Sequence, residues 1–281
     1  MLFVPGIRQD RFDKAMSAGA DAVVFDLEDS VEAGQKAKAR VLIAEFLATP
    51  SEKTTRLVRL NALHTPDGEA DLEFFSGVPG FDGLLLPKIE SAGAAELVAQ
   101  AFGWDTDAGA VPSLLLLLET PCAILRAAEI AAADAPVAAL VLGAEDLTAS
   151  LAVERTVDGE ELVFARGQIA MAAAAVRAEA IDAVFTNLKD AESLRRDCTR
   201  ARALGFRGKM AIHPNQIEVI NDVFTPSAAE VDRATGIIAA YEAAHATGEG
   251  VTTLEGLMVE LPIVERARRI LAIAARRPRV G

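Results

Sequence analysis

Two carboxylates, Glu119 and Asp146, follow long apolar runs of the chain, LLLLL at 114–118 and AALVLG at 138–143. Oxygen ligands without paired histidines or thiolates favour Mg²⁺ over zinc. Mg²⁺ prefers six oxygens and commonly takes only one or two from protein carboxylates, while water and substrate supply the rest. The pair therefore predicts a magnesium site in which Glu119 and Asp146 are the protein ligands.

Further polar residues stand just after apolar runs. Carboxylates in such a group repel one another unless a cation or a proton lies between them. We therefore expect Asp26, Glu28 and Glu90 to orient metal-bound water or to pair with nearby cations. Arg59 and Lys88 are those cations. Other polar residues that stand just after apolar runs are Asp29, Asn61, Glu145, Asn187, His213 and Asn215.

A carboxylate after a strand is often only a helix cap, and Asp29 and Asp190 are interpreted in this way. The interpretation is weaker for Glu119, because Thr120 can cap the next helix and Pro121 can begin it.

Two other residues have alternative interpretations. Lys88 could be the Schiff-base nucleophile of a metal-free aldolase, although a lysine beside Glu90 is more often a charge partner. His213 is a weak candidate for a base, and the proline that follows it, Pro214, suggests a role in shaping a turn.

The elements that must position these residues are eight apolar runs, which we predict to be strands. Each run is continuous rather than alternating, as in strands that are buried on both faces of a parallel sheet. The runs are 2–5, 22–27, 56–60, 83–87, 113–118, 138–143, 183–186 and 209–212. Helical patterns fill most gaps, at 11–19, 30–48, 91–103, 121–133, 161–180 and 190–205.

This alternation predicts a (β/α)8 TIM barrel, whose active site lies at the carboxyl ends of the strands. A doubly wound open sheet is the alternative, but it usually carries a GxGxxG or GxxxxGK loop, and neither occurs here. After residue 225 only helical patterns are found, at 226–248 and 262–277. We therefore predict a barrel over 1–225 and a C-terminal helical extension over 226–281, which packs on the barrel or on a neighbouring subunit.

Composition excludes several classes of protein. The net charge of -13 argues against a general nucleic-acid binder, although a local basic pocket could still bind an anionic small molecule. No apolar run reaches the roughly 18 residues of a membrane span, and MLFVPGIRQD shows no basic leader of a signal peptide. The two cysteines suit neither a disulfide framework nor a zinc site. We expect a cytoplasmic enzyme.

Motifs along nearly the whole chain, from Leu2 to about Pro262, resemble the citrate lyase β-subunit-like family. They are LFVPG, AVVFDLEDSV followed by KAKAR, VRLNAL, DGLLLPKIES, LLLLLETP, ALVLGAEDLTASL, GFRGKMAIHPNQI and PSAAEV…AYE, in this order. The resemblance is to the citramalyl-/malyl-CoA lyase branch of the phosphoenolpyruvate-binding barrels. It implies a (β/α)8 barrel, assembly as a homotrimer or a multiple of one, and Mg²⁺.

The resemblance also implies residue roles. Glu119 of the ET motif and Asp146 of GAEDL would hold the metal, with Glu119 also at the substrate. Arg59 of VRxN would bind the substrate carbonyl or carboxylate, and Asp26 and Glu28 of DLED would support metal-bound water. The thioester's pantetheine arm would lie near Pro5, Gly6, His213 and Pro214.

Two positions depart from the pattern of the family. Many relatives have an aspartate in place of Asn187, and many have GxMID where this chain reads GLMVELP, with Glu260 at the aspartate position. In relatives that aspartate reaches a neighbouring subunit's site as an acid or base. Glu260 keeps a carboxyl on a longer arm, so it is the candidate for proton transfer, and Arg59 and Glu260 are the predicted catalytic residues.

The implied reaction is reversible cleavage of a 3-hydroxy-3-carboxyl acyl-CoA thioester, such as citramalyl-CoA or malyl-CoA, to acetyl-CoA and a 2-oxo acid. One alternative is a citrate lyase subunit that acts on a citryl thioester bound to a carrier. Others are the Schiff-base aldolase with Lys88, a barrel enzyme that acts on phosphoenolpyruvate-like acids without CoA, and a purely structural or binding role. We expect no nucleic-acid or membrane partner.

Overall fold

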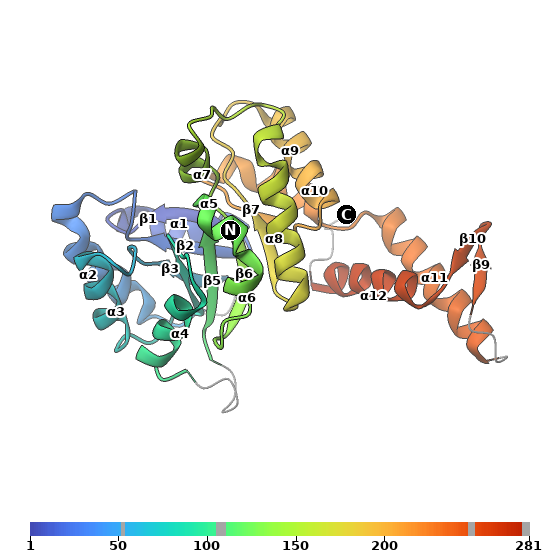
Figure 1. The fold of residues 1–281 in the computed structure, drawn as a ribbon, viewed down its shortest axis with the longest axis horizontal. Coiled ribbons are helices and arrows are strands. Elements are labelled where there is room, and N and C mark those ends of the chain that lie inside the picture. The colour runs from blue at the N-terminus through green and yellow to red at the C-terminus, as the bar shows by residue number, and fades with distance from the viewer. Residues whose placement is uncertain (52–53, 105–110, 247–250, 277–281) are drawn as a thin grey trace. The chain divides into compact units, whose positions relative to one another are not determined.

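The computed structural model describes residues 1–51, 54–104, 111–246 and 251–276, and the chain divides into two compact units, 1–220 and 221–281. The first unit contains eight strands, each of which pairs in parallel with the next one along the chain. The sheet closes on itself, because the Phe3 N–H donates to the Ala211 carbonyl at 2.9 Å and the Ala211 N–H to the Met1 carbonyl at 2.7 Å. This is a (β/α)8 barrel with its helices outside (Figure 1), so the predicted fold class is confirmed.

The barrel strands are short and mostly buried. They are β1 (Leu2–Pro5), β2 (Ala22–Asp26), β3 (Thr55–Arg59), β4 (Gly83–Leu86), β5 (Ser113–Leu118), β6 (Val137–Leu142), β7 (Glu179–Asp182) and β8 (Gly208–Lys209). Side chains of one parity point into the barrel and pack there as a single apolar core. It includes Val24, Leu57, Leu85, Leu115, Leu117, Val141 and Met210.

The helices of the first unit are partly as predicted. They are α1 (Phe12–Met16), α2 (Lys36–Leu47), α3 (Pro66–Phe75), α4 (Ala92–Ala101), α5 (Pro121–Leu125), α6 (Ala127–Ala131), α7 (Ala144–Leu151), α8 (Val163–Ala175) and α9 (Ala191–Ala203), with short 3-10 turns at η1 (Gln9–Arg11), η2 (Ala33–Gln35), η3 (Glu160–Leu162) and η4 (Pro214–Gln216). Helix α10 (Ile217–Phe224) contains the boundary between the two units, which falls after residue 220. The predicted caps at Thr120 and Asp190 are confirmed, since their side chains accept the N–H groups of Ala123 and Ser193 at 3.1 and 2.9 Å. Helices α3, α7 and α10 were not predicted.

The prediction of the seventh strand was wrong. It placed the strand at 183–186, whereas β7 spans Glu179–Asp182 and contains two carboxylates. A charged residue is rare in a buried strand unless it is paired. Asp182 is 0% exposed and is paired with two buried cations, which allows the strand to include it.

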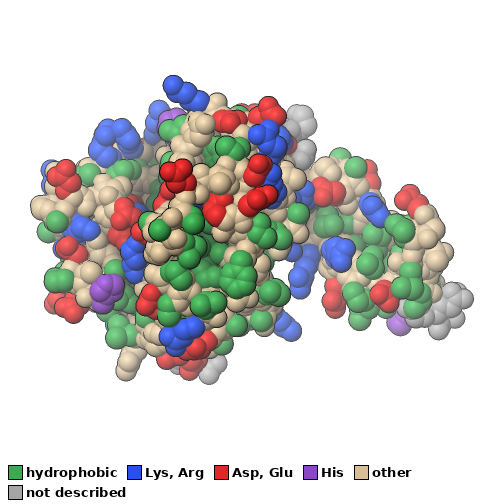
Figure 2. Space-filling model, turned by 45° about the horizontal axis from the view of Figure 1, so that its top comes forward, with side chains coloured by type: hydrophobic (Ala, Val, Ile, Leu, Met, Phe, Trp, Pro, Cys, Tyr) green, Lys and Arg blue, Asp and Glu red, His purple; other side chains and the backbone are tan. Residues whose placement is uncertain are grey.

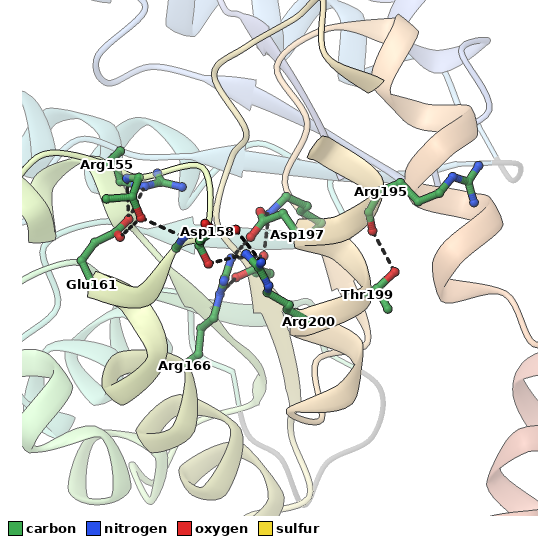
Figure 3. Close-up of polar contacts among 12 residues, drawn as sticks. Arg155, Asp158, Glu161, Arg166, Arg195, Asp197, Thr199 and Arg200 are labelled. Atoms are coloured by element: carbon green, nitrogen blue, oxygen red, sulfur yellow. Dashed lines mark hydrogen bonds and ion pairs between the residues drawn. The ribbon is translucent and has the colours of Figure 1, made fainter. Parts of the chain in front are cut away.

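A buried ionic network joins four elements around Asp182. Arg166 of α8 donates two hydrogen bonds of 2.9 Å to Asp182 and one of 2.7 Å to Asp197 of α9. Lys209 of β8 donates to the same two carboxylates at 2.5 and 2.6 Å. Figure 3 shows Arg166 and Asp197 meeting between the two helices. The network fixes α8 and α9 against the last two strands of the barrel.

Replacing Arg166 by methionine is expected to lower the free energy of unfolding by about 3–5 kcal/mol, because buried carboxylates lose a partner. Urea denaturation followed by circular dichroism measures this change. Arg196→Met is the matched control, since Arg196 forms an exposed pair with Glu192 on α9 that is expected to contribute under about 1 kcal/mol. Equal destabilisation by the two substitutions would contradict the prediction.

The second unit contains two long helices and a small hairpin. Helix α11 (Ala228–Ala246) and helix α12 (Leu261–Arg276) match the predicted 226–248 and 262–277 as far as these ranges are described. Strands β9 (Thr252–Leu254) and β10 (Leu257–Val259) pair antiparallel through a turn at Glu255 and Gly256, whose φ angles are +53° and +80°. The predicted extension was purely helical, and three-residue strands are too short to show a periodic pattern. None of the helices in the described ranges combines the length and apolar character that crossing a bilayer needs.

Candidate active site

The candidate catalytic side chains continue the inward-facing rows of the barrel core. Side chains alternate along a strand, so a residue two positions beyond an inward-facing one points the same way. Asp26 follows Val24, Arg59 follows Leu57, and Glu119 follows Leu117. Because parallel strands end at one edge, all three side chains are brought to the carboxyl end of the barrel, where TIM-barrel enzymes have their active sites.

Arg59 is held in one orientation by surrounding carboxylates. Its Nε and Nη2 donate to the two oxygens of Asp26 at 2.6 and 2.7 Å, a bidentate pair. Its Nη1 lies 2.7 Å from Glu28 Oε2 and 3.3 Å from Asp29 Oδ2. The Phe3 ring lies beneath the guanidinium, with 5.1 Å between Cζ and the ring centroid. Burial acts to raise the pKa of Asp26, but the pair with Arg59 outweighs it and lowers that pKa below its usual range.

Glu28 is a buried carboxyl with incomplete partnering. Its Oε2 has no aligned hydrogen bond in the part of the chain that is described, despite the 2.7 Å approach of Arg59 Nη1. Burial raises the pKa of Glu28 to about 8, against the attraction of Arg59 and with the repulsion of Asp29 and Glu119. This side chain therefore has an oxygen left to accept a further proton, water or ligand donor.

Glu119 and Asp146 converge on a single cation, the Lys88 ammonium. The Lys88 Nζ hydrogen-bonds to Asp146 Oδ2 and lies 3.7 Å from Glu119 Oε1, while the Lys88 N–H donates to that Glu119 oxygen at 2.7 Å. Burial raises the pKa of Glu119 to about 7, with Lys88 opposing and Asp146 adding to the rise. For Asp146, burial acts to raise the pKa, but the hydrogen bonds with Lys88 and Glu119 and the charge of Lys88 together outweigh burial, and the pKa is lowered.

Gly143 determines where the Glu119 side chain can lie. A Cβ at this position would lie 2.3 Å from the Glu119 Cβ and 2.7 Å from its Oε2, far inside van der Waals contact. Gly143 was not among the predicted site residues, because a glycine after a strand shows nothing in the sequence of what packs against it.

Replacing Gly143 by alanine is expected to displace the Glu119 carboxylate and to weaken Mg²⁺ binding about 10–100-fold, as changes in residues that orient a ligand do. Calorimetric titration with Mg²⁺ measures the effect. Gly167→Ala on α8 is the control, because the added Cβ there would have no neighbour within 4 Å beyond the adjacent residues and the backbone of its own helix. Unchanged affinity in Gly143→Ala would contradict the proposed position of Glu119 as a ligand.

These side chains surround a cavity of about 390 Å³ at the barrel mouth. Its lining residues are Phe3, Pro5, Asp26, Asp29, Ser30, Arg59, Leu117, Glu119, Gly143, Ala144, Glu145, Asp146, Val184, Met210 and Ile212. Its lining combines apolar side chains with a few charged ones, as in sites that orient a small polar substrate. Over the face shown in Figure 2, acidic side chains are scattered among basic and apolar ones, in keeping with the net charge of -13.

Five of the predicted site residues line this cavity, namely Pro5, Asp26, Arg59, Glu119 and Asp146. Glu28 and Lys88 reach the site by contact with them.

Gly6 supports the site through the backbone. Its N–H donates to the Asp26 carbonyl at 2.8 Å, and a Cβ at Gly6 would lie 2.7 Å from that oxygen.

The structure places the other predicted residues differently. The carboxylate of Glu90 accepts the Thr120 hydroxyl at 2.7 Å and does not line the cavity. His213 is exposed, and its Nδ1 accepts the Asn215 N–H at 3.2 Å. It stands just before η4, which begins at Pro214, and this agrees with the interpretation that His213 shapes a turn.

Glu260 belongs to the second unit, where its carbonyl accepts the Ile263 N–H at 2.9 Å at the start of α12.

Ser30 is a residue that sequence reasoning misassigned. The predicted helix at 30–48 would begin at Ser30, but η2 and α2 begin later, and the Ser30 hydroxyl donates to Asp26 Oδ2 at 2.5 Å. The helix is offset because the segment DLEDS turns back to surround Arg59. Phe3 was also not predicted. It stands two residues before Pro5 on β1, so both side chains point to the same side of the strand, and both line the cavity.

The donor set fits a hard divalent cation. Two carboxylates converge on a position that a positively charged group already occupies, which shows that a cation is favourable there. Within the described residues no group of three or more histidine, cysteine, aspartate or glutamate side chains is arranged for a metal. Two carboxylates with open positions for water and substrate are what Mg²⁺ commonly takes from a protein.

The fold and site define a TIM-barrel enzyme with a carboxylate-rich cavity at its carboxyl edge. The chain belongs to the HpcH/HpaI aldolase/citrate lyase family, whose pattern it matches over residues 1–214. The resemblance inferred from the motifs is thus confirmed, as is the prediction of an enzyme from a family of carbon–carbon lyases.

Similar proteins cover nearly the whole chain. It is 37% identical over 279 residues to citrate lyase subunit beta of Leuconostoc mesenteroides subsp. cremoris, covering 98% of this chain and 92% of that one. It is 38% identical over 277 residues to a (3S)-malyl-CoA thioesterase of Cereibacter sphaeroides, covering 98% and 93%. The crystal structure of CitE from Mycobacterium tuberculosis with magnesium, acetoacetate and coenzyme A superposes with a TM-score of 0.80 at 35% identity, covering 98% and 97%.

Proposed function

We propose that this protein is a Mg²⁺-dependent lyase that cleaves or forms the carbon–carbon bond of a 3-hydroxy-3-carboxyl acyl-CoA thioester such as citramalyl-CoA or malyl-CoA. The products of cleavage are acetyl-CoA and a 2-oxo acid. The observation that carries the proposal is the convergence of Glu119 and Asp146 on one cation position beside Arg59. The similar CitE structures that hold magnesium with acetoacetate and coenzyme A, or with oxaloacetate, support it.

A Mg²⁺ ion held by Glu119 and Asp146 would supply Lewis acidity toward the hydroxyl and carboxylate oxygens of the substrate. Arg59 binds the same end of the substrate, since its guanidinium lines the cavity and keeps its charge at any working pH. The bidentate pair with Asp26 fixes the guanidinium plane before substrate arrives, so little reorganisation is needed as charge develops. The apolar side chains that line the cavity, such as Leu117 and Met210, would limit the access of water to the acetyl enolate.

The Schiff-base alternative is disfavoured by the surroundings of Lys88. A nucleophilic lysine needs a lowered pKa, so that the free amine is available. Burial acts to lower the pKa of Lys88, but the hydrogen bond with Asp146 and the charge of Glu119 outweigh it, and the pKa is raised. The ammonium is therefore held protonated, as a charge partner and not as a nucleophile.

The proposal is tested with purified protein, Mg²⁺ and a panel of malyl-, citramalyl- and citryl-thioesters, free and carrier-bound. Released 2-oxo acid and released thiol are measured separately, because one group of relatives consists of thioesterases. We expect 2-oxo acid and acetyl-CoA in equal amounts from a CoA ester, with loss of activity in EDTA. Release of free CoA without 2-oxo acid, activity only on carrier-bound ester, or full activity in EDTA would each reject it.

Glu260 from a neighbouring subunit of a homotrimer, or a multiple of one, is proposed to move a proton. Replacing Glu260 by glutamine is then expected to lower kcat about 10²–10⁴-fold while Mg²⁺ affinity stays unchanged. Mixing this variant with subunits impaired by Arg59→Lys tests the sharing of sites, because mixed oligomers would regain activity above that of either variant alone. Unchanged kcat in Glu260→Gln would remove this residue from the mechanism.

A further inference from the structure

Lys88 has an unusual backbone conformation at the centre of the site. Its φ is +54°, in the left-handed region that residues other than glycine rarely adopt, and such outliers often occur at functional positions. In this conformation its N–H bonds to Glu119 while its side chain crosses to Asp146. One residue therefore contacts both proposed metal ligands, through the backbone and through the ammonium.

We propose that Lys88 is a tethered cation that occupies the Glu119–Asp146 site when Mg²⁺ is absent and leaves it when Mg²⁺ binds, and so sets the affinity of the site for the metal. This inference rests on the proposed magnesium site. The physical reason is that an ammonium and a divalent ion compete for the same two carboxylates. Two cations held side by side between these carboxylates would also repel each other. With Lys88 present, Mg²⁺ must displace a bonded charge before it can bind.

A second lysine in the barrel shows why Lys88 is able to exchange. Lys209 also bridges two carboxylates, Asp182 and Asp197, but its side chain is 0% exposed. The side chain of Lys88 is 29% exposed and that of Asp146 is 44% exposed. A long flexible stem that is open to solvent can move its charge into water at small cost, whereas a buried one cannot.

Competition predicts that removal of the Lys88 charge increases the affinity for Mg²⁺, whereas structural damage would decrease it. If Lys88 merely held the carboxylates in place, its removal would weaken Mg²⁺ binding. If it competes with the metal, removal raises the local negative charge and strengthens binding. Without Mg²⁺ the same removal takes the nearest cation away from Glu119 and Asp146, so the metal-free protein is expected to melt at a lower temperature and to recover when Mg²⁺ is added.

The experiment is a calorimetric Mg²⁺ titration of the full chain as wild type, Lys88→Met, Lys88→Gln and Lys88→Arg, with melting curves in EDTA and in Mg²⁺. Lys38→Met, at an exposed lysine of α2, controls for the change in net charge. We expect binding about tenfold tighter or more in Lys88→Met and Lys88→Gln, and no gain in Lys88→Arg or Lys38→Met.

Equal or weaker binding in both neutral variants, a tenfold gain in Lys38→Met as well, or no binding in any variant would overturn the inference. Failure of the proposed lyase reaction is a separate result. It would appear as wild-type protein that releases no 2-oxo acid, while the difference in Mg²⁺ affinity between wild type and Lys88→Met persists.

Discussion

Replacing Glu119 by glutamine is expected to lower kcat by a factor of about 10³ or more, because the substitution removes a charged ligand of the ion that stabilises developing negative charge. The folded state should survive, since the glutamine carbonyl oxygen can still accept the Lys88 N–H that now bonds to Glu119 Oε1 at 2.7 Å. The measurement is steady-state release of 2-oxo acid at saturating thioester over a range of Mg²⁺ concentrations. A metal-binding defect would be offset in part by excess Mg²⁺.

The matched control for this prediction is Glu129→Gln. Glu129 lies on α6, is exposed, and pairs with Arg126, so the same chemical change there should leave kcat near the wild-type value. Asp146→Asn should resemble Glu119→Gln, because both side chains contact the same cation position. Near wild-type activity in both site variants would contradict the proposed role of Mg²⁺ in the reaction.

Replacing Arg59 by lysine is expected to lower kcat/KM about 10²–10³-fold although the positive charge is kept. Lysine cannot reproduce the bidentate pair with Asp26, and a single ammonium cannot present a second pair of donors to a substrate carboxylate. Most of the loss should appear in kcat, because the guanidinium is aimed at oxygens that gain charge during the reaction.

The control for this prediction lies on the same strand. Arg56 of β3 is also buried, but it points out of the barrel, where its Nη1 donates to the carbonyls of Leu47 and Thr49 at 3.3 and 2.7 Å. Arg56→Lys should lower stability slightly and leave kcat/KM within about threefold of wild type. Equal losses of activity in the two variants would show that the effect of Arg59→Lys is structural and not a loss of substrate binding.

The barrel was predictable because its strands are continuous apolar runs. A run such as 113–118 is typical of a strand that is buried on both faces of a parallel sheet. The prediction failed where charge enters a strand. Asp182 marked a boundary in the sequence, and only the cations of α8 and β8 make it a core residue. The hairpin of the second unit was missed because each strand spans three residues.

The candidate site was predictable to the extent that it follows strand parity. Asp26, Arg59 and Glu119 each stand two residues after an inward-facing core residue, and their types suggested a metal and an anionic substrate. Contacts between distant segments were not predictable. Nothing in the sequence indicates that Gly143 packs on Glu119, or that the lysine after β4 reaches the aspartate of α7.

The most direct test of the account is the number of Mg²⁺ ions bound per chain in a calorimetric titration with a 2-oxo acid present. Wild-type protein should bind one ion per chain, Glu129→Gln should bind it with the same affinity, and both Glu119→Gln and Asp146→Asn should lose it. Wild-type binding in those two site variants would contradict the claim that these carboxylates hold the metal at the barrel mouth.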